Sequence, residues 1–206
     1  TAFNMTADQA GRFADVLAQA SSNSNTNVAM MGATFQKVAP VAGALGYSVE
    51  DVSLAIGLMA NASIKSEVAG TSLKTALANM AKPTKQMKEY MDKYGISLTN
   101  ADGSMKSFRE VVDNLRSSLG GLSETEQVAA ATAIFGKESF AGMLAIVNAS
   151  EADFQKLSDS VNNSAGAAER MAQIKLDNFQ GKVTLLQSAV EGLQIALGDA
   201  LLPTFT

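Results

Sequence analysis

Apolar positions recur every three or four residues along most of the chain, the spacing of one face of an α-helix. Short polar stretches separate these segments, and small polar residues or glycines stand at their ends. Ser, Thr, Asn and Asp cap helix N-termini, whereas Gly ends helices. The pattern predicts an all-α fold, a multi-helix bundle of about eight to nine helices.

Serines mark several of the predicted helix starts. Ser107 caps one helix, and Ser48, Ser123 and Ser150 each have an acidic residue three positions later, the spacing of a capping box. The helix that follows Ser48 is apolar on more than one face, so we expect it to be buried on several sides. Pro40 removes an amide donor inside the segment from about 27 to 45, which predicts a kink or break near residue 38.

One short segment departs from the helical pattern. The sequence ISLTNADGSMKS places Asn100, Asp102 and Gly103 between short apolar pieces. These three residue types supply turn chemistry. The segment predicts one small β-hairpin in an otherwise helical chain.

The last forty residues predict a long helix with a heptad seam. From about residue 165 to 202 only isolated glycines interrupt the helical pattern. Apolar residues alternate there at spacings of three and four over four heptads, as they do where a helix packs along a partner. The candidate seam consists of Leu176, Phe179, Val183, Leu186, Val190, Leu193, Leu197 and Ala200. Packing against a partner helix and packing against the chain's own domain both remain open.

Three apolar residues, Leu185, Ile195 and Leu202, lie off the candidate seam, so the end of this helix is apolar nearly all round. Such a surface is expected to be buried against another chain segment or another copy. We predict a helical core domain over residues 1–163, with a candidate sub-boundary near 82–83. Residues 164–206 form the long helix, the start of a rod that continues in a longer parent protein.

Composition argues against catalysis and against nucleic-acid binding. The 206 residues contain no His, Cys or Trp, so the most adaptable acid–base group and the commonest nucleophiles and metal ligands are missing. The net charge of −4 offers no general attraction for phosphate backbones. We therefore predict a structural protein that is not an enzyme, with no catalytic, cofactor-binding or metal site and no nucleic-acid readout.

One pair of motifs could indicate an enzyme that uses a carboxylate. Glu138-Ser139-Phe140 and Gly57-Leu58-Met59 superficially resemble motifs of lysozyme-like lytic transglycosylases. In that family the Glu-Ser element precedes the Gly-Leu-Met element, whereas here it follows about eighty residues later. A cell-wall hydrolase is therefore only the third hypothesis.

The stretch from Val38 to Pro83 carries a more specific signal than its periodicity. It contains Ala-Pro, then Gly-Tyr-Ser-Val-Glu-Asp at a helix start, then Asn-Ala-Ser-Ile-Lys, then Ala-Gly-Thr-Ser-Leu. In this order the elements resemble the core region of phage tail tape-measure proteins. The resemblance continues through an Asp-Gly turn and Ile-Phe-Gly at 134–136 to the long helix, and so covers nearly the whole chain. Ser63 stands where that family commonly has Gly.

The resemblance implies a structural phage tail component located in the tail lumen of the virion and made in the host bacterial cytoplasm. Such a protein sets tail length, scaffolds assembly of the tail tube and is released at genome ejection. The implied partners are other copies of itself, the tail tube protein, and baseplate or assembly chaperones. The alternative is a membrane-active helical module that assists genome delivery, with membrane contact at ejection.

Overall fold

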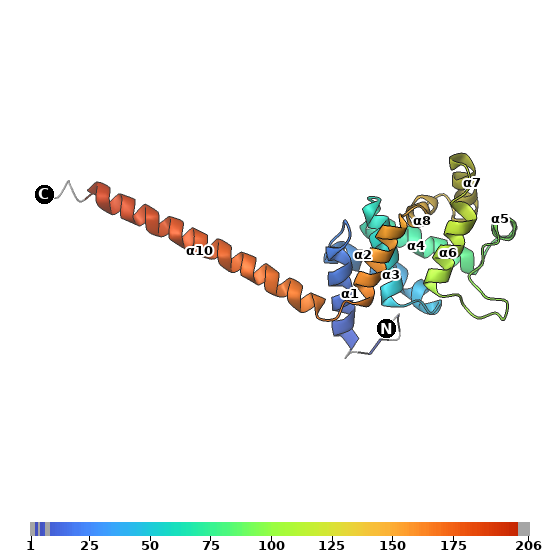
Figure 1. The fold of residues 1–206 in the computed structure, drawn as a ribbon, viewed down its shortest axis with the longest axis horizontal. Helices are drawn as coiled ribbons and strands as arrows, with labels where there is room; N and C mark the ends of the chain where they lie inside the picture. The colour runs from blue at the N-terminus through green and yellow to red at the C-terminus, as the bar shows by residue number, and fades with distance from the viewer. Residues whose placement is uncertain (1–2, 4, 7–8, 202–206) are drawn as a thin grey trace. The chain divides into compact units, whose positions relative to one another are not determined.

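The computed structural model describes residue 3, residues 5–6 and residues 9–201, with side-chain surroundings given as far as residue 191. The described residues form ten α-helices and no strand, which confirms the predicted all-α class (Figure 1). The helices are α1 (Ala10–Ser22), α2 (Val28–Ala44), α3 (Val49–Asn61), α4 (Ser66–Ala81), α5 (Lys85–Tyr94), α6 (Phe108–Leu119), α7 (Glu124–Phe135), α8 (Phe140–Val147), α9 (Glu151–Asn162) and α10 (Ala167–Leu201).

Two details of the predicted fold class were wrong. The predicted number of helices, about eight to nine, is lower than the ten that the described residues form; the short α8 follows Gly136, which ends α7 at a φ of 90°. The predicted β-hairpin does not form. Within the described residues the segment around Gly103 contains one isolated antiparallel bridge, between Thr99 and Met105.

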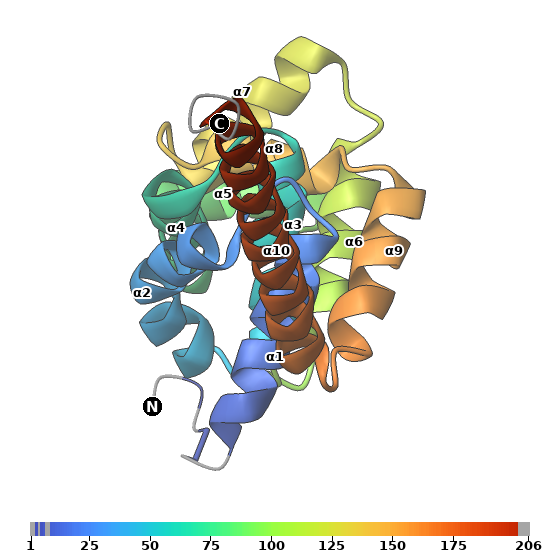
Figure 2. The same cartoon turned by 90° about the vertical axis from the view of Figure 1, so that its left-hand side faces the viewer.

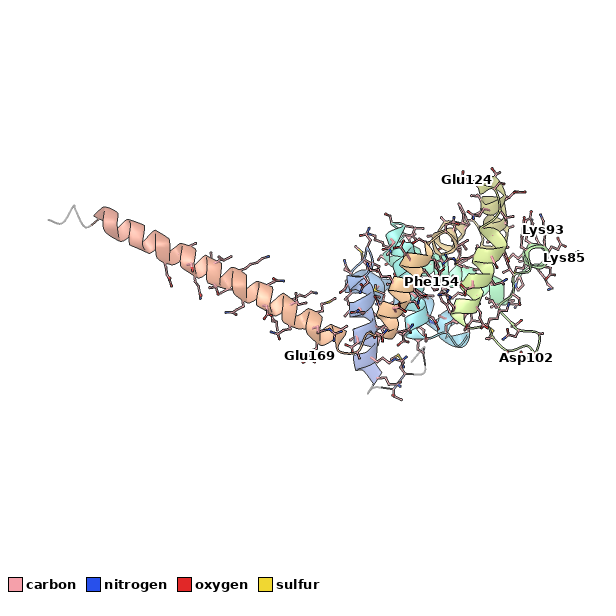
Figure 3. The ribbon with its side chains drawn as sticks, in the orientation of Figure 1. Lys85, Lys93, Asp102, Glu124, Phe154 and Glu169 are labelled. Carbon is pink, nitrogen blue, oxygen red and sulfur yellow. The ribbon has the colours of Figure 1, made fainter. Side chains whose placement is uncertain are left out.

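The pairing extends no further than this bridge, which two backbone bonds flank, from the Asn100 amide to the Ser104 carbonyl and from the Lys106 amide to the Leu98 carbonyl, both at 2.8 Å. Asp102, near the tip of the segment (Figure 3), accepts from the Ser104 amide at 2.9 Å, which removes that donor from a strand ladder. Such local bonds compete with regular structure. A single pair of short strands without a third neighbour is also marginal in water.

The predicted helix starts are confirmed. Ser48, Ser107 and Ser123 each accept a bond from the backbone amide three residues later, and the acidic side chain at that position accepts from the serine amide in return. Ser150 accepts from the amide of Asp153 at 3.0 Å. These reciprocal bonds satisfy amides that have no partner within the helix.

Helix α3 forms the centre of the globular part, as its apolar faces predicted. Eleven of its thirteen residues are buried. Helices α2 and α4 lie on one side of it, whereas α6 and α9 lie on the other (Figure 2). Helices α1, α3 and α9 pack against one another (Figure 1).

Helix α2 continues through Pro40 as one helix, so the chain is not broken near residue 38. Pro40 and Gln36 are both exposed. Pro40 has no amide hydrogen to donate to the Gln36 carbonyl, so water can donate a hydrogen bond to this carbonyl instead. On the other face Thr34 and Val38 are fully buried, and this packing keeps the helix continuous.

Aromatic and arginine side chains join α9 to α6. Phe154 of α9 is fully buried (Figure 3), and the Arg109 guanidinium lies 4.2 Å from the centre of its ring. Arg116 lies 5.6 Å from the same ring. Glu151 pairs with Arg109 at 3.2 Å and with Arg116 at 3.3 Å. The buried ring contributes through its area and the cation–π contacts, whereas the exposed ion pairs contribute little.

By its internal contacts the chain divides into two compact units, residues 1–168 and residues 169–206. The first contains α1–α9 and the first two residues of α10, with one continuous apolar core built around α3. The second is the remainder of α10. It contains the candidate seam.

Candidate interaction surface on the C-terminal helix

Helix α10 runs for 35 residues, which at 1.5 Å per residue corresponds to about 50 Å. It contains no proline, and most of its residues are Ala, Leu, Gln, Glu, Lys, Arg and Met, which lose little freedom in a helix. Gln173 donates to Asp177 at 2.8 Å, a bond between side chains four residues apart on the helix surface. Helix propensity alone therefore accounts for much of its formation.

The described seam side chains are largely exposed. Leu176, Phe179 and Leu186 are 61–66% exposed, Val190 is 46% exposed and Val183 is partly exposed. A row of large apolar side chains in water is unfavourable by about 1.5–3 kcal/mol for each one that a partner could bury. The spacing of three and four places them on one face of α10.

The rest of the candidate seam lies beyond the residues whose side chains are described. Leu193, Leu197 and Ala200 belong to helical backbone. The same holds for Ile195, which was predicted to lie off the seam. Leu202, the last off-seam residue, lies outside the described residues altogether.

Two exposed apolar residues lie away from the seam on α10. Leu185 is 73% exposed and Ile174 is 61% exposed. They are eleven positions apart, about three turns, and therefore share a face roughly opposite the seam. The heptad pattern predicted that Leu185 lies off the seam; Ile174 was not singled out from the sequence.

The residues that flank the seam were not singled out from the sequence. In the heptad that begins at Leu176, the position after Phe179, Leu186 and Leu193 is a glutamine: Gln180, Gln187 and Gln194. On the other side of the seam, Lys175 and Lys182 precede Leu176 and Val183. Flanking positions of this kind choose partners through charge in many coiled coils. The neutral glutamines on one flank carry no charge that would repel an identical helix, whereas the other flank carries the two lysines.

The two motifs that resemble those of lytic transglycosylases, Gly57-Leu58-Met59 and Glu138-Ser139-Phe140, lie in the globular unit. Gly57 packs against Leu157, and Gly142 packs against Met59, so both glycines serve close helix contacts. Ser139 is fully buried, whereas Glu138 is exposed. Sequence order had already argued against a lytic transglycosylase, and this arrangement does not bring the two motifs together around an open cleft.

Hollows on the globular unit are modest in size. One of about 410 Å³ lies beside Arg12, Asp15 and Glu50, and one of about 300 Å³ lies beside Arg109 and Asp51. A third, of about 290 Å³, has a mixed lining that includes Met80, Met91 and Ile96 together with Lys88 and Asp92. Among the described residues no group of three or more acidic, His or Cys side chains is arranged to hold a metal ion. In that same part of the chain, no helix combines the length and the hydropathy that crossing a bilayer demands.

The motif-rich stretch from Val38 to Pro83 folds into the centre of the globular unit. Gly70 of the Ala-Gly-Thr-Ser-Leu element lies against α2, and Ser72 donates to the Ser139 carbonyl at 3.1 Å. Asn61 of the Asn-Ala-x-Ile-Lys element accepts from the Asn25 amide at 2.9 Å. The residues that carry the family resemblance therefore make close contacts or hydrogen bonds between segments of the globular unit.

Comparison with known proteins identifies the family. Residues 1–136 match the profile of the family described as phage-related minor tail protein. The match covers more than half of the chain, which therefore belongs to this family of structural phage tail proteins.

The relatives sharpen the identification. The chain is 37% identical over 202 residues to the tape measure protein of Pneumococcus phage Dp-1, a match that covers 98% of this chain and 18% of that protein. It is 25% identical over 202 residues to the probable tape measure protein of Escherichia phage P2, covering 97% of this chain and 25% of that protein. These matches confirm the resemblance to tape-measure proteins. The chain spans a quarter or less of the length of either relative, and no solved structure matches it.

Proposed function

We propose that this chain is the part of a tape-measure protein in which a globular helical domain is followed by the start of a rod. The parent protein sets the length of the phage tail, scaffolds assembly of the tail tube and is released at genome ejection. The family membership and the names of the two relatives support this role over a membrane-active module. The protein would then reside in the tail lumen of the virion after synthesis in the host bacterial cytoplasm.

The partners in this role are other copies of the same chain, the tail tube protein, and baseplate or assembly chaperones. The feature that favours contact between copies is the exposed seam of α10, in which Leu176, Phe179 and Leu186 are each more than 60% exposed. Packing the seams of two or more copies together removes these side chains from water. On the flank that carries Gln180 and Gln187, no charge opposes the approach of an identical helix.

Tail length provides the test of the measuring role. Removing residues 176–189 from the parent gene deletes two whole heptads and keeps the seam in register. At 1.5 Å per residue the expected shortening is about 21 Å, measured by electron microscopy averaged over many tails. Duplicating the same fourteen residues should lengthen the tail by the same amount. Unchanged tails in both variants would refute the proposal.

Self-association through the seam is tested on the 206-residue chain by a pair of neighbouring substitutions. Leu186→Glu places a charge in the seam, whereas Leu185→Glu places the same charge one residue away on a side chain that is 73% exposed. Sedimentation equilibrium should show the association constant reduced at least about tenfold by Leu186→Glu, since burying an unpaired charge is costly. Leu185→Glu should leave association nearly unchanged. Equal effects, or a wild-type chain that stays monomeric at high concentration, would contradict the seam.

A further inference from the structure

The start of α10 is held by a residue that is distant in the sequence, on the first helix of the globular unit. The Asp15 carboxylate on α1 accepts from the Gly166 amide through Oδ2 and from the Ala168 amide through Oδ1, both at 2.9 Å. Amides at a helix start lack partners within the helix, and a carboxylate also complements the positive end of the helix dipole. Asp15 therefore acts as an N-terminal cap supplied from about 150 residues away.

The chain reaches Asp15 through a tight turn that depends on glycine. Gly166 has a φ of 71°, in the left-handed region that side chains other than hydrogen disfavour. The Ala167 amide donates to the Ser164 carbonyl at 2.9 Å. Ala167 and Ser164 are both buried. The contacts that close the turn thus include an internal bond, the bonds to Asp15 and the burial of small side chains.

The surroundings of Asp15 are polar and contain free space. The hollow of about 410 Å³ is lined by Arg12, Asp15, Ser48, Glu50, Asn162, Ser164 and Ala165. Arg12 pairs across it with Glu50 at 2.7 Å. Because this space admits water, the carboxylate and the two amides can be solvated when they separate. The buried side chains of the turn, Ala167 and Ser164, are small, so their exposure costs little hydrophobic free energy.

From this geometry we propose that Asp15 is a latch for the joint between α9 and α10. With the latch closed, Gly166 and Ala168 at the start of α10 are fixed to α1. With it open, residues 164–168 become a short tether while α1, α3 and α9 stay folded. The inference concerns this joint alone and holds whether or not the seam mediates self-association.

Native-state hydrogen exchange of the 206-residue chain, followed by NMR, tests the latch without any substitution. Local opening predicts that the Gly166 and Ala168 amides exchange at a rate that does not depend on low concentrations of urea. Amides of the buried helix α3 should instead exchange faster as urea is added, because they require global unfolding. If Gly166 and Ala168 show the urea dependence of α3, the joint does not open separately and the proposal fails.

Substitutions then identify Asp15 as the group responsible. Asp15→Ala should lower protection of the Gly166 and Ala168 amides roughly 10–100-fold, the range expected for losing bonds to a charged acceptor. Asp15→Asn keeps one oxygen acceptor and should fall between Asp15→Ala and wild type. Asp177→Asn makes the same charge change within α10, away from the joint, and should leave both amides within about twofold.

Two outcomes with these variants would overturn the proposal. Protection of Gly166 and Ala168 within about twofold of wild type in Asp15→Ala would show that the carboxylate does not hold the turn. An equal loss of protection throughout α3 would show that Asp15 supports the whole unit and is no local latch. Should Asp15→Ala fail to fold, the same two comparisons apply to Asp15→Asn.

Discussion

The contact between α2 and α4 depends on a glycine, and Gly70→Ala is the most direct way to test that packing. A Cβ built on Gly70 would lie 2.8 Å from the Thr34 carbonyl oxygen and 2.8 Å from Lys37 Cβ. Ordinary van der Waals contact begins near 3.4 Å, so the two helices must separate by about 0.6 Å. The nearest atoms belong to the backbone or lie beside it, and they cannot swing away as the end of a long side chain could.

Opposing effects set the magnitude of this change. Alanine in place of glycine within a helix normally stabilises by about 0.5–1 kcal/mol, because the unfolded chain loses freedom. Overpacking a close contact costs about 1–3 kcal/mol. A gap of about 0.6 Å also forfeits a quarter or more of the dispersion energy of the atoms it parts. We therefore expect Gly70→Ala to lower the free energy of unfolding by about 1–2 kcal/mol.

Gly32→Ala is the matched control, since Gly32 also lies within α2 and a Cβ there would meet nothing within 4 Å. It should stabilise the chain by about 0.5–1 kcal/mol. Urea unfolding followed by circular dichroism measures both variants, with changes expected in the midpoint and not in the slope. In thermal unfolding, 1 kcal/mol corresponds to about 2–4 °C for a unit of this size. A Gly70→Ala chain as stable as wild type would refute the argument.

Three further substitutions should change the free energy of unfolding, two of them upward or not at all and one downward. Ser63→Gly should stabilise by about 0.5–1 kcal/mol in urea unfolding, because Ser63 has a φ of 67° after α3, where glycine is favoured. Tyr47→Phe should be neutral or stabilise by up to about 1 kcal/mol, since the buried Tyr47 hydroxyl has no hydrogen-bond partner among the described residues and the ring still packs on Phe108 at 5.6 Å. Ser107→Ala should cost about 1 kcal/mol at pH 7 and less at pH 3, because bonds from the Ser107 side chain and amide lower the pKa of Glu110.

A control or a contradicting result tests the reason given for Ser63→Gly and for Tyr47→Phe. Ser63→Ala cannot relieve the left-handed backbone, so a gain equal to that of Ser63→Gly would exclude strain as the cause. A loss above about 1 kcal/mol in Tyr47→Phe would indicate a hydrogen bond to its hydroxyl. Burial, and then the charge of Asp51, raise the pKa of Tyr47 to about 12, so its absorbance should titrate well above pH 10 in the folded chain.

The pH argument for Ser107 follows from the sign of the shift. Lowering the pKa of Glu110 in the folded state stabilises the fold at pH values above the ordinary pKa of a glutamate. That contribution disappears as the pH falls through the lowered pKa. Urea unfolding at pH 7 and pH 3 should therefore show a difference between wild type and Ser107→Ala that shrinks in acid. An unchanged difference would mean that the carboxylate plays no part in the cap.

Features that depend on neighbours in the sequence were predicted well. The caps at Ser48, Ser107 and Ser123 use residues three positions apart, so the pattern contains both partners. The turn predicted near Gly103 is present, but the predicted pair of strands on either side of it is not. Whether strands pair depends on competing side chains and on neighbouring elements that a local pattern does not contain.

Features that depend on distant residues were not predicted. Nothing near Asp15 in the sequence points to Gly166, and nothing near Gly70 indicates that Thr34 is the neighbour that excludes a Cβ. Of the kink or break that Pro40 predicted, the break does not occur, because the burial of α2 against the core keeps the helix continuous. In each case the missing information is which surfaces meet.

The sequence by itself determined that this protein is helical, where most of its helices begin, and that its last helix carries an apolar seam of regular period. Those properties come from backbone capping and side-chain periodicity, which act over a few residues. The tertiary structure alone decided that Gly70 lets two helices touch and that Asp15 closes the start of α10. These contacts join residues that only the folded chain brings together, because burial of the apolar faces selects one arrangement of the helices.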